Sequence, residues 1–243
     1  MSIVFLTALG VGGATVFGAI IGYLFKGFAL KSKDTVLSFA AGVMLSSSII
    51  GLILPSLQQG GRFPVAVTIT GIFSGALCIK LLSSIIPRIL KNETDFSGEN
   101  LTLHRVIVFV SAIAIHNLPE GIAAGVGFGT GNTADALFIA LGIAIQNIPE
   151  GMVIIPPMLS CGVSPFKAFL TAVFTGLIEV IGTFIGYFAV SISAALLPFA
   201  LSFAGGTMIY VICGEMIPET NENKSNKWVT FSLILGFCLI LLI

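Results

Sequence analysis

Residues 113–121 read IAIHNLPEG, and residues 143–151 read IAIQNIPEG. Seven of the nine positions are identical, and the second copy begins 30 residues after the first. Thirty residues correspond to one membrane crossing of about 20 residues and a short turn, so the two copies are expected to run antiparallel. Inverted segments that meet at half-depth commonly enclose a polar site. The repeat therefore predicts an inverted pair of helices around a shared site.

The composition of the whole chain defines the class of protein. Of the 243 residues, 56% are hydrophobic and 9% are charged, whereas a soluble globular domain carries about 25% charged residues. So few charges cannot cover an aqueous surface, which excludes a soluble enzyme and indicates an all-α polytopic membrane protein in a lipid bilayer. The 11 Lys and Arg residues balance the 11 Asp and Glu residues, so the charge does not favour a nucleic-acid partner.

Apolar stretches fill nearly the whole chain, so we predict one transmembrane domain, residues 1–243, with eight helices. The predicted helices cover residues 4–25, 35–58, 63–86, 105–128, 134–158, 165–190, 193–216 and 228–243. The segment 87–104 is polar and mixed in charge, which predicts a loop. Glycines spaced four apart predict close helix contacts and are compatible with a homodimer. These pairs are Gly18/Gly22, Gly71/Gly75, Gly121/Gly125 and Gly182/Gly186.

The basic residues predict the orientation of the chain. Nine of the 11 Lys and Arg residues lie in or beside the connections after the first, third, fifth and seventh predicted helices. The positive-inside rule places these connections, including the loop 87–104, in the cytoplasm. Both termini are then expected on the outside of the cell membrane.

The two motifs are predicted to reach the middle of the membrane. His116 lies 11 residues beyond Arg105, and Gln146 lies 11 residues beyond Asp135. At 1.5 Å per residue each is about 16 Å deep in a hydrocarbon core of about 30 Å. Pro119 and Pro149 lack an N–H, so we expect them to break helices 4 and 5 and free one carbonyl each. Broken helices are tolerated at this depth where they line a polar pocket.

Three carboxylates are also predicted to lie deep in the membrane, at Glu120, Glu150 and Glu179. An ionisable group there costs at least about 2.5–3.5 kcal/mol, so the three require compensation. They could be protonated and hydrogen-bonded, or could act in a proton relay, but a divalent cation compensates them better. Because imidazole and amide groups accompany them, at His116, Asn117, Gln146 and Asn147, the predicted ion is Zn²⁺, Fe²⁺, Mn²⁺, Co²⁺ or Cd²⁺. Hydrogen bonding between helices is the alternative role of the two asparagines.

HNLPEG at 116–121 and QNIPEG at 146–151, within eight predicted helices, resemble the ZIP (Zrt-, Irt-like protein) family of divalent metal transporters. The span-5 motif, which begins with glutamine, resembles the bacterial branch. The resemblance implies a first metal site of His116, Glu120, Gln146 and Glu150. It implies a second, adjacent site of Asn117, Asn147 and Glu179 with the shared glutamates, hence a binuclear centre.

Two further residues are implied by the same resemblance. Met44 matches a methionine that closes over the first site, or is a core residue. Glu215, in ICGEMIPE, matches an acidic ligand at the cytoplasmic exit. This sequence departs from the family at Gly214, where relatives often have histidine, and at Asn147, where some have aspartate. Both departures weaken the sites in which they lie.

The residues and the resemblance together predict a transporter of divalent transition-metal ions, foremost Zn²⁺, into the cytoplasm. The metal is the transported substrate and no catalytic cofactor is expected. A bundle of helices 1, 4, 5 and 6 is expected to shift against helices 2, 3, 7 and 8 in an elevator-like motion. A selective channel and a metal exporter with the same ligands are the alternatives. An enzyme is disfavoured because the chain has two histidines and no HExxH motif.

Overall fold

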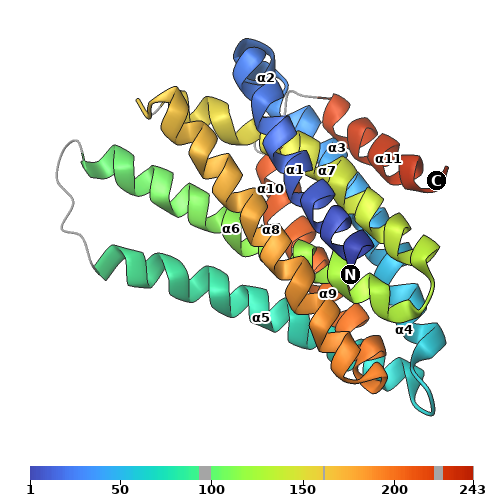
Figure 1. The fold of residues 1–243 in the computed structure, drawn as a ribbon. Helices are drawn as coiled ribbons and strands as arrows, with labels where there is room; N and C mark the ends of the chain where they lie inside the picture. Colours follow the sequence, from blue (N-terminus) through green and yellow to red (C-terminus); the bar gives the residue numbers. More distant parts are fainter. Residues whose placement is uncertain (93–99, 161, 222–226, 243) are drawn as a thin grey trace.

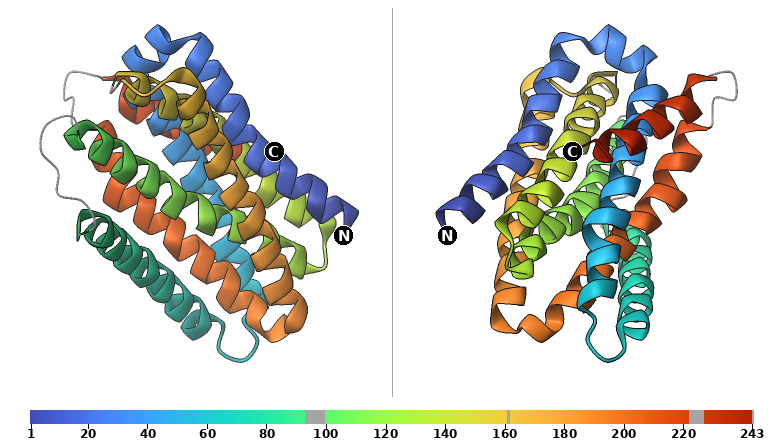
Figure 2. Two further views of the ribbon diagram at one scale, coloured as in Figure 1. Left: turned by 60° about the vertical axis from the view of Figure 1, so that its left-hand side comes forward. Right: turned by 90° about the vertical axis from the view of Figure 1, so that its right-hand side faces the viewer.

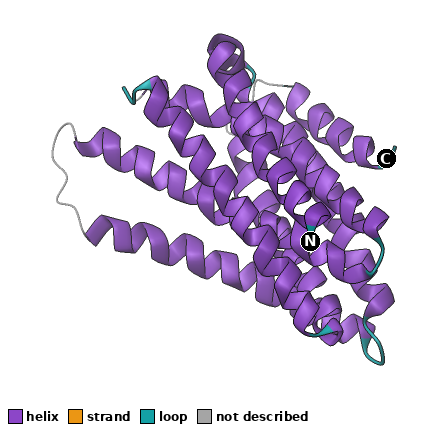
Figure 3. Cartoon of the chain, viewed as in Figure 1, coloured by secondary structure: helices purple, strands orange, loops and turns teal. Residues whose placement is uncertain are grey.

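The computed structural model describes residues 1–92, 100–160, 162–221 and 227–242, and the regular secondary structure in these ranges is helical (Figure 3). The α-helices are α1 Ser2–Leu24, α2 Lys26–Lys31, α3 Lys33–Ser47, α4 Leu54–Gln59, α5 Pro64–Asn92, α6 Asn100–Gly127, α7 Thr133–Ser160, α8 Pro165–Ile192, α9 Leu197–Val211, α10 Ile217–Thr220 and α11 Trp228–Ile240. Two π-helical segments, η1 Ser48–Ile53 and η4 Ile212–Met216, and two 3-10 turns, η2 Phe128–Thr130 and η3 Ala194–Leu196, connect them.

Six helical segments in the described residues are long and apolar enough to cross a membrane. They are Ser2–Leu24, Lys33–Gln59, Pro64–Ile85, Thr133–Leu159, Pro165–Ile192 and Leu197–Thr220. This confirms the prediction of an all-helical, multi-pass membrane protein. The count of eight crossings stays a prediction: α6 covers the range predicted for the fourth helix, and α11 is an apolar helix of 13 residues.

Helices occupy both ends of the segment that was predicted as the loop 87–104. Helix α5 continues to Asn92 and α6 begins at Asn100, while residues 93–99 lie outside the described residues. The polar composition of the segment indicated a loop. However, Arg, Leu and Lys between 88 and 91 are good helix formers, so they extend α5 beyond its apolar part.

The irregular turns of the long helices lie in places that the sequence did not predict. The π-helical segments η1 and η4 are each followed closely by a proline, Pro55 and Pro218. A proline leaves a carbonyl of the preceding turn without its donor, and a wider turn can accommodate that loss. By contrast, α6 and α7 continue as α-helices past Pro119 and Pro149, so the predicted breaks in these helices are not confirmed.

The helices form two groups (Figures 1 and 2). In the first, α1 packs along α7 and α8, and α6 packs along α8. In the second, α5 packs along α9, α11 packs along α3, and the continuation of α3 through η1 and α4 packs on α9. The groups meet mainly where α3 contacts α7 and where α6 contacts α9. The first group holds the helices predicted to move together.

Glycines bring the helices within each group into backbone contact. A Cβ added to Gly121 would overlap the carbonyl oxygen of Glu179, and one added to Gly42 would overlap that of Leu233. At the boundary between the groups, the atom nearest to Gly142 is instead a side-chain atom of Ser47. The close contacts predicted for paired glycines are therefore confirmed within the groups. The positions concerned are Gly18, Gly22, Gly71, Gly75, Gly121, Gly125, Gly182 and Gly186.

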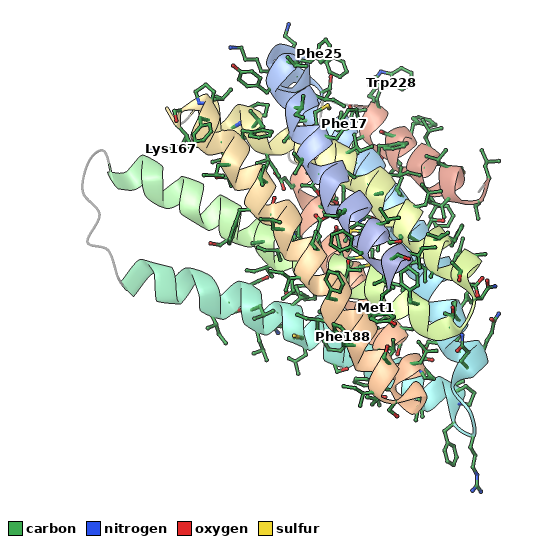
Figure 4. All side chains as sticks on the ribbon, viewed as in Figure 1. Met1, Phe17, Phe25, Lys167, Phe188 and Trp228 are labelled. Atoms are coloured by element: carbon green, nitrogen blue, oxygen red, sulfur yellow. The ribbon has the colours of Figure 1, made fainter. Side chains whose placement is uncertain are left out.

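The outer surface of the bundle is apolar, as a bilayer requires. Phe17, Phe188 and Trp228 are half or more exposed, and their side chains lie on the outside of the bundle (Figure 4). The connections from α1 to α3 and from α7 to α8, and the start of α11, lie at one end of the bundle (Figures 1 and 2). These connections carry five of the ten Lys and Arg residues in the described ranges, Lys26, Lys31, Lys33, Lys167 and Lys227, so we refer to this end as the basic end of the bundle.

Candidate metal-binding site

The two motifs and one residue of α8 bring their polar side chains together in the first group of helices. Helix α6 contributes His116, Asn117 and Glu120, and α7 contributes the equivalent residues 30 positions later. Glu120 lies close enough to Glu150 and Glu179 for electrostatic interaction, and the side-chain amide of Gln146 lies beside it. Most of these side chains are fully removed from solvent: Asn117, Glu120, Gln146, Asn147 and Glu179 are at most 1% exposed.

The buried oxygen atoms of this cluster lack donors. Six oxygens of the two motifs are buried and have no hydrogen-bond partner among the described residues. They are Asn117 Oδ1, both carboxylate oxygens of Glu120, Gln146 Oε1, Asn147 Oδ1 and Glu150 Oε1. Nearly all buried polar atoms in proteins have a partner, so a group of six unpartnered acceptors needs an explanation. Carboxylate and amide oxygens beside an imidazole form a donor set that suits a divalent transition-metal ion.

Glu179 differs from the other two carboxylates because its oxygens are already hydrogen-bonded. Oε1 accepts from Thr15 Oγ1 at 2.7 Å and from Asn117 Nδ2 at 2.5 Å. Oε2 accepts from Asn147 Nδ2 at 2.7 Å. The same Asn147 nitrogen lies 3.2 Å from the carbonyl oxygen of Val11. Glu179 therefore interacts with both motif asparagines and with α1.

His116 lies at the edge of the cluster, between the two groups of helices. Its Nε2 atom is 2.8 Å from Oε2 of Glu215, which belongs to η4 of the second group, and its charge interacts with that of Glu150. Ser83 of α5 donates a weak hydrogen bond of 3.4 Å to the other oxygen of Glu215. His116 therefore contacts the second group of helices through Glu215.

A cavity of about 140 Å³ connects the buried carboxylates with the basic end of the bundle. Its wall includes Glu120, Glu150, His116 and Glu215, and it ends at Glu219 and Lys33. Side-chain exposure rises along it, from 0% at Glu120 to 16% at His116, 32% at Glu215 and 43% at Glu219. The cavity therefore opens toward the end where α3 begins and α10 ends.

The mouth of the cavity carries an ion pair. Lys33 Nζ lies 2.5 Å from Glu219 Oε1, and the two side chains are 33% and 43% exposed. Glu215 and Glu219 are four residues apart and line the same wall. Carboxylates thus occur at successive depths, from the buried pair to the mouth.

The predicted ligands do not form a complete metal-binding group in the described residues, and Met44 lies in the hydrophobic core. Within the described residues, no three His, Cys, Asp or Glu side chains are already arranged to hold an ion. Met44 is 1% exposed and belongs to the main hydrophobic core, and it is not in the described wall of the cavity.

The sequence reasoning missed Thr15, Lys33 and Glu219. Thr15 lies in a helix without charged residues, and its contact with Glu179 joins positions 164 residues apart. A polar residue in the middle of an apolar helix was the available signal. Lys33 was counted only among the basic residues that predict the orientation, and the sequence carried no prediction for Glu219.

Comparison with known proteins identifies the family. A family profile described as ZIP Zinc transporter matches residues 90–243. The zinc transporter ZIPB of Bordetella bronchiseptica is 34% identical over 234 residues, covering 94% of this chain and 76% of that protein. The chain belongs to the ZIP family. The zinc transporter GufA of Myxococcus xanthus is 33% identical over 240 residues, covering 96% of this ZIP chain and 94% of that protein.

A eukaryotic relative extends the comparison. The human zinc transporter ZIP11 is 28% identical over 315 residues, covering 93% of this ZIP chain and 91% of that protein. The resemblance predicted from the two motifs is confirmed, and the bacterial relatives agree with the predicted branch. Both motifs, Glu179 and Glu215 lie in the part of the ZIP chain that matches the family profile. Met44 and Thr15 lie before it.

Proposed function

We propose that this ZIP protein transports divalent transition-metal ions, with Zn²⁺ as the main substrate, through the buried cluster of its two motifs. The observation that carries the proposal is the set of six unpartnered, buried oxygens at the end of a cavity. The relatives that it matches over nearly its whole length are named as zinc transporters, not as enzymes, which supports the same substrate class and a transport function.

The ion is held by His116, Glu120, Gln146 and Glu150. In the structure Glu120 lies beside Gln146 and near Glu150, so three of the four ligands are already grouped. His116 completes the set by rotating away from Glu215. A divalent ion neutralises the two carboxylates, which lowers the cost of keeping them in a low-dielectric interior. Fe²⁺, Mn²⁺ and Cd²⁺ suit the same ligands and are proposed as weaker substrates.

The two groups of helices support an alternating-access, elevator-like movement. The ligands belong to the first group, whose helices are joined by glycine contacts between backbones. At the boundary with the second group, the nearest atoms to Gly142 and Gly51 belong to side chains, those of Ser47 and Ile139. A sliding motion there requires no separation of backbones. The first group therefore carries the ion, and the second group remains in place as the frame.

Release occurs through the cavity toward the basic end, which the positive-inside rule assigns to the cytoplasm. Helix α1 runs toward that end and α11 begins at it (Figure 2), which supports an orientation with both termini on the outside of the cell membrane. His116 transfers the ion from the buried carboxylates to Glu215 in the second group, since its ring contacts Glu215 and lines the same cavity as Glu120 and Glu150. Met44 closes the site from the other side, and the protein works as a monomer or a homodimer in the bilayer.

The test is uptake of radioactive zinc by proteoliposomes that contain the purified protein. Glu120→Ala and Glu150→Ala are expected to abolish uptake while the protein elutes as a folded species from a sizing column. Asp135→Asn is the matched control, because Asp135 is an exposed acid at the start of α7, away from the cavity. Uptake that is unchanged in both alanine variants would contradict the proposed site.

Direction and mechanism need a second measurement. Vesicles loaded with zinc and diluted into chelator measure export, and saturation at a low turnover number distinguishes a carrier from a channel. Ion currents of more than about 10⁶ ions per second lie far beyond the usual rates of enzymes and carriers and would contradict alternating access.

A further inference from the structure

We propose that Thr15 and Glu179 form a hydrogen-bonded clamp that orients Asn117 and Asn147, so that this chain binds one metal ion and not two. The proposal rests on the proposed transport function. It assigns Thr15 as a positioning residue and gives Glu179 a role other than that of a metal ligand. Because Asn147 is an amide and not a carboxylate, the second position offers an ion less negative charge than an aspartate there would.

Thr15 lies in a buried and apolar part of the bundle. This residue is 1% exposed and lies in the middle of α1, which has no charged residue. Its backbone is held in place because a Cβ added to Gly151 of α7 would overlap the Thr15 carbonyl oxygen. The hydroxyl therefore has a fixed position, from which it donates to Glu179 Oε1 at 2.7 Å.

The carboxylate of Glu179 fixes the orientation of the two amides. Asn117 and Asn147 each direct Nδ2 to a different oxygen of Glu179, at 2.5 and 2.7 Å. Only the nitrogen of an amide can donate to a carboxylate, so the carboxylate determines which way each amide faces. The oxygen of each amide must then point away from Glu179. Both of these oxygens are buried and have no partner among the described residues.

The hydrogen bonds of Glu179 limit which oxygens can bind a metal ion. Three donors already satisfy the oxygens of Glu179, and a second ion would have to displace them. A buried donor that loses its acceptor costs about 1–3 kcal/mol, so displacement is unfavourable. The oxygens of the two amides, of Glu120 and one oxygen of Glu150 are left without a partner among the described residues. The clamp thus favours a single, well-oriented site.

The clamp also joins the helices that carry the site. Thr15 belongs to α1, Asn117 to α6, Asn147 to α7 and Glu179 to α8. The Val11 carbonyl of α1 accepts a further contact from Asn147. All four helices belong to the first group, so the clamp moves with the ion and is not broken by a shift between the groups.

The experiment compares variants of the full-length protein in detergent, with zinc counted by mass spectrometry after equilibrium dialysis and affinity measured by calorimetry. Thr15→Val keeps the shape and removes the hydroxyl, Thr15→Ser restores it, and Thr175→Val is the matched control. Thr175 is a buried threonine of α8 whose hydroxyl donates to a backbone carbonyl within its own helix. Melting of the metal-free protein reports on folding.

We expect one zinc ion per wild-type chain. Thr15→Val should weaken zinc binding about fivefold or more, equivalent to the loss of one hydrogen bond of about 1 kcal/mol. Thr15→Ser should restore the affinity, and Thr175→Val should not change it. Glu179→Gln should weaken binding further without changing the count of one ion. A melting temperature that falls while affinity stays constant would mean that Thr15 is only structural, and would overturn the proposal.

Two ions per wild-type chain, falling to one in Glu179→Gln, would also overturn the clamp, since Glu179 would then be a ligand. The proposed function fails in a different way. If the wild-type protein binds no zinc in dialysis and takes up none in proteoliposomes, the transport site itself is wrong. If the wild-type protein transports zinc and all Thr15 variants behave alike, only the clamp is wrong.

Discussion

Glu120→Gln is expected to change stability and transport in opposite directions. Both oxygens of Glu120 are buried without a partner, and Glu150 and Glu179 add like charges nearby. The substitution keeps the size of the side chain, removes a negative charge and introduces an amide that can donate to the free oxygens of Gln146 and Glu150. Without metal, the variant should therefore be more stable than the wild-type protein.

The magnitudes follow from these contacts. One or two new buried hydrogen bonds contribute about 1–2 kcal/mol, and 1 kcal/mol shifts the melting temperature of a chain of this size by about 2–4 °C. The metal-free variant should melt about 2–8 °C higher. Zinc at 100 times its dissociation constant stabilises the wild-type protein by about 2.7 kcal/mol. Removing one partner of a buried charge pair costs roughly 3–5 kcal/mol, which would weaken zinc binding on the order of 10²–10⁴-fold.

The assay is thermal unfolding in detergent, first with chelator and then with zinc, followed by zinc uptake in proteoliposomes. The order of stability should reverse: the variant melts higher in chelator, and the wild-type protein gains about 5–11 °C with zinc while the variant gains almost none. Asp135→Asn, an exposed acid-to-amide change, should leave both values unchanged. A variant that melts lower in chelator, or that keeps its response to zinc, would refute the reasoning.

Three other changes test separate parts of the structure. Gly121→Ala places a methyl group against the Glu179 carbonyl, so α6 and α8 must separate at a cost of about 1–3 kcal/mol; melting should fall by about 2–12 °C, and an equal fall in Gly10→Ala, where the space is open, would contradict this. Glu215→Gln removes the charge that receives His116, so the maximal rate of uptake should fall roughly tenfold with no rise in KM; a raised KM with a normal rate would argue against a role in release. Lys33→Met breaks a partly exposed ion pair, so stability should change by less than about 1 kcal/mol, and a larger loss in thermal unfolding would show that the pair is structural.

The sequence alone predicted an all-helical membrane protein and the proximity of the two motif glutamates, since both follow from local features. The length of the apolar stretches predicts the helices. Carboxylates that recur at equal depth in the membrane are expected to share one compensating partner. The sequence could not predict which carboxylate is hydrogen-bonded and which is free. Glu179 and Glu150 look alike in the sequence, but Thr15 and two asparagines donate to the first, whereas Glu150 keeps an oxygen without a donor.

The sequence likewise could not predict the positions of the π-helical turns or the direction in which the His116 side chain points. A proline near Glu215 indicates an irregular helix but does not say where the turn widens, because that depends on the packing of α9. His116 points to Glu215 only because η4 lies beside α6 in three dimensions. Contacts between helices distant in sequence determine both features.

The pairing of α3 with α11 has a consequence for biosynthesis. Ser38 donates to the Val229 carbonyl and Ser232 donates to the Thr35 carbonyl, across separations of 191 and 197 residues. The backbone contact at Gly42 is also completed by α11. While the ribosome is still translating the middle of the chain, α11 has not been made. The hydrogen bonds of α3 with α11 and the contact at Gly42 therefore cannot yet form. We expect quality-control proteases of the membrane to recognise chains that stall before residue 228.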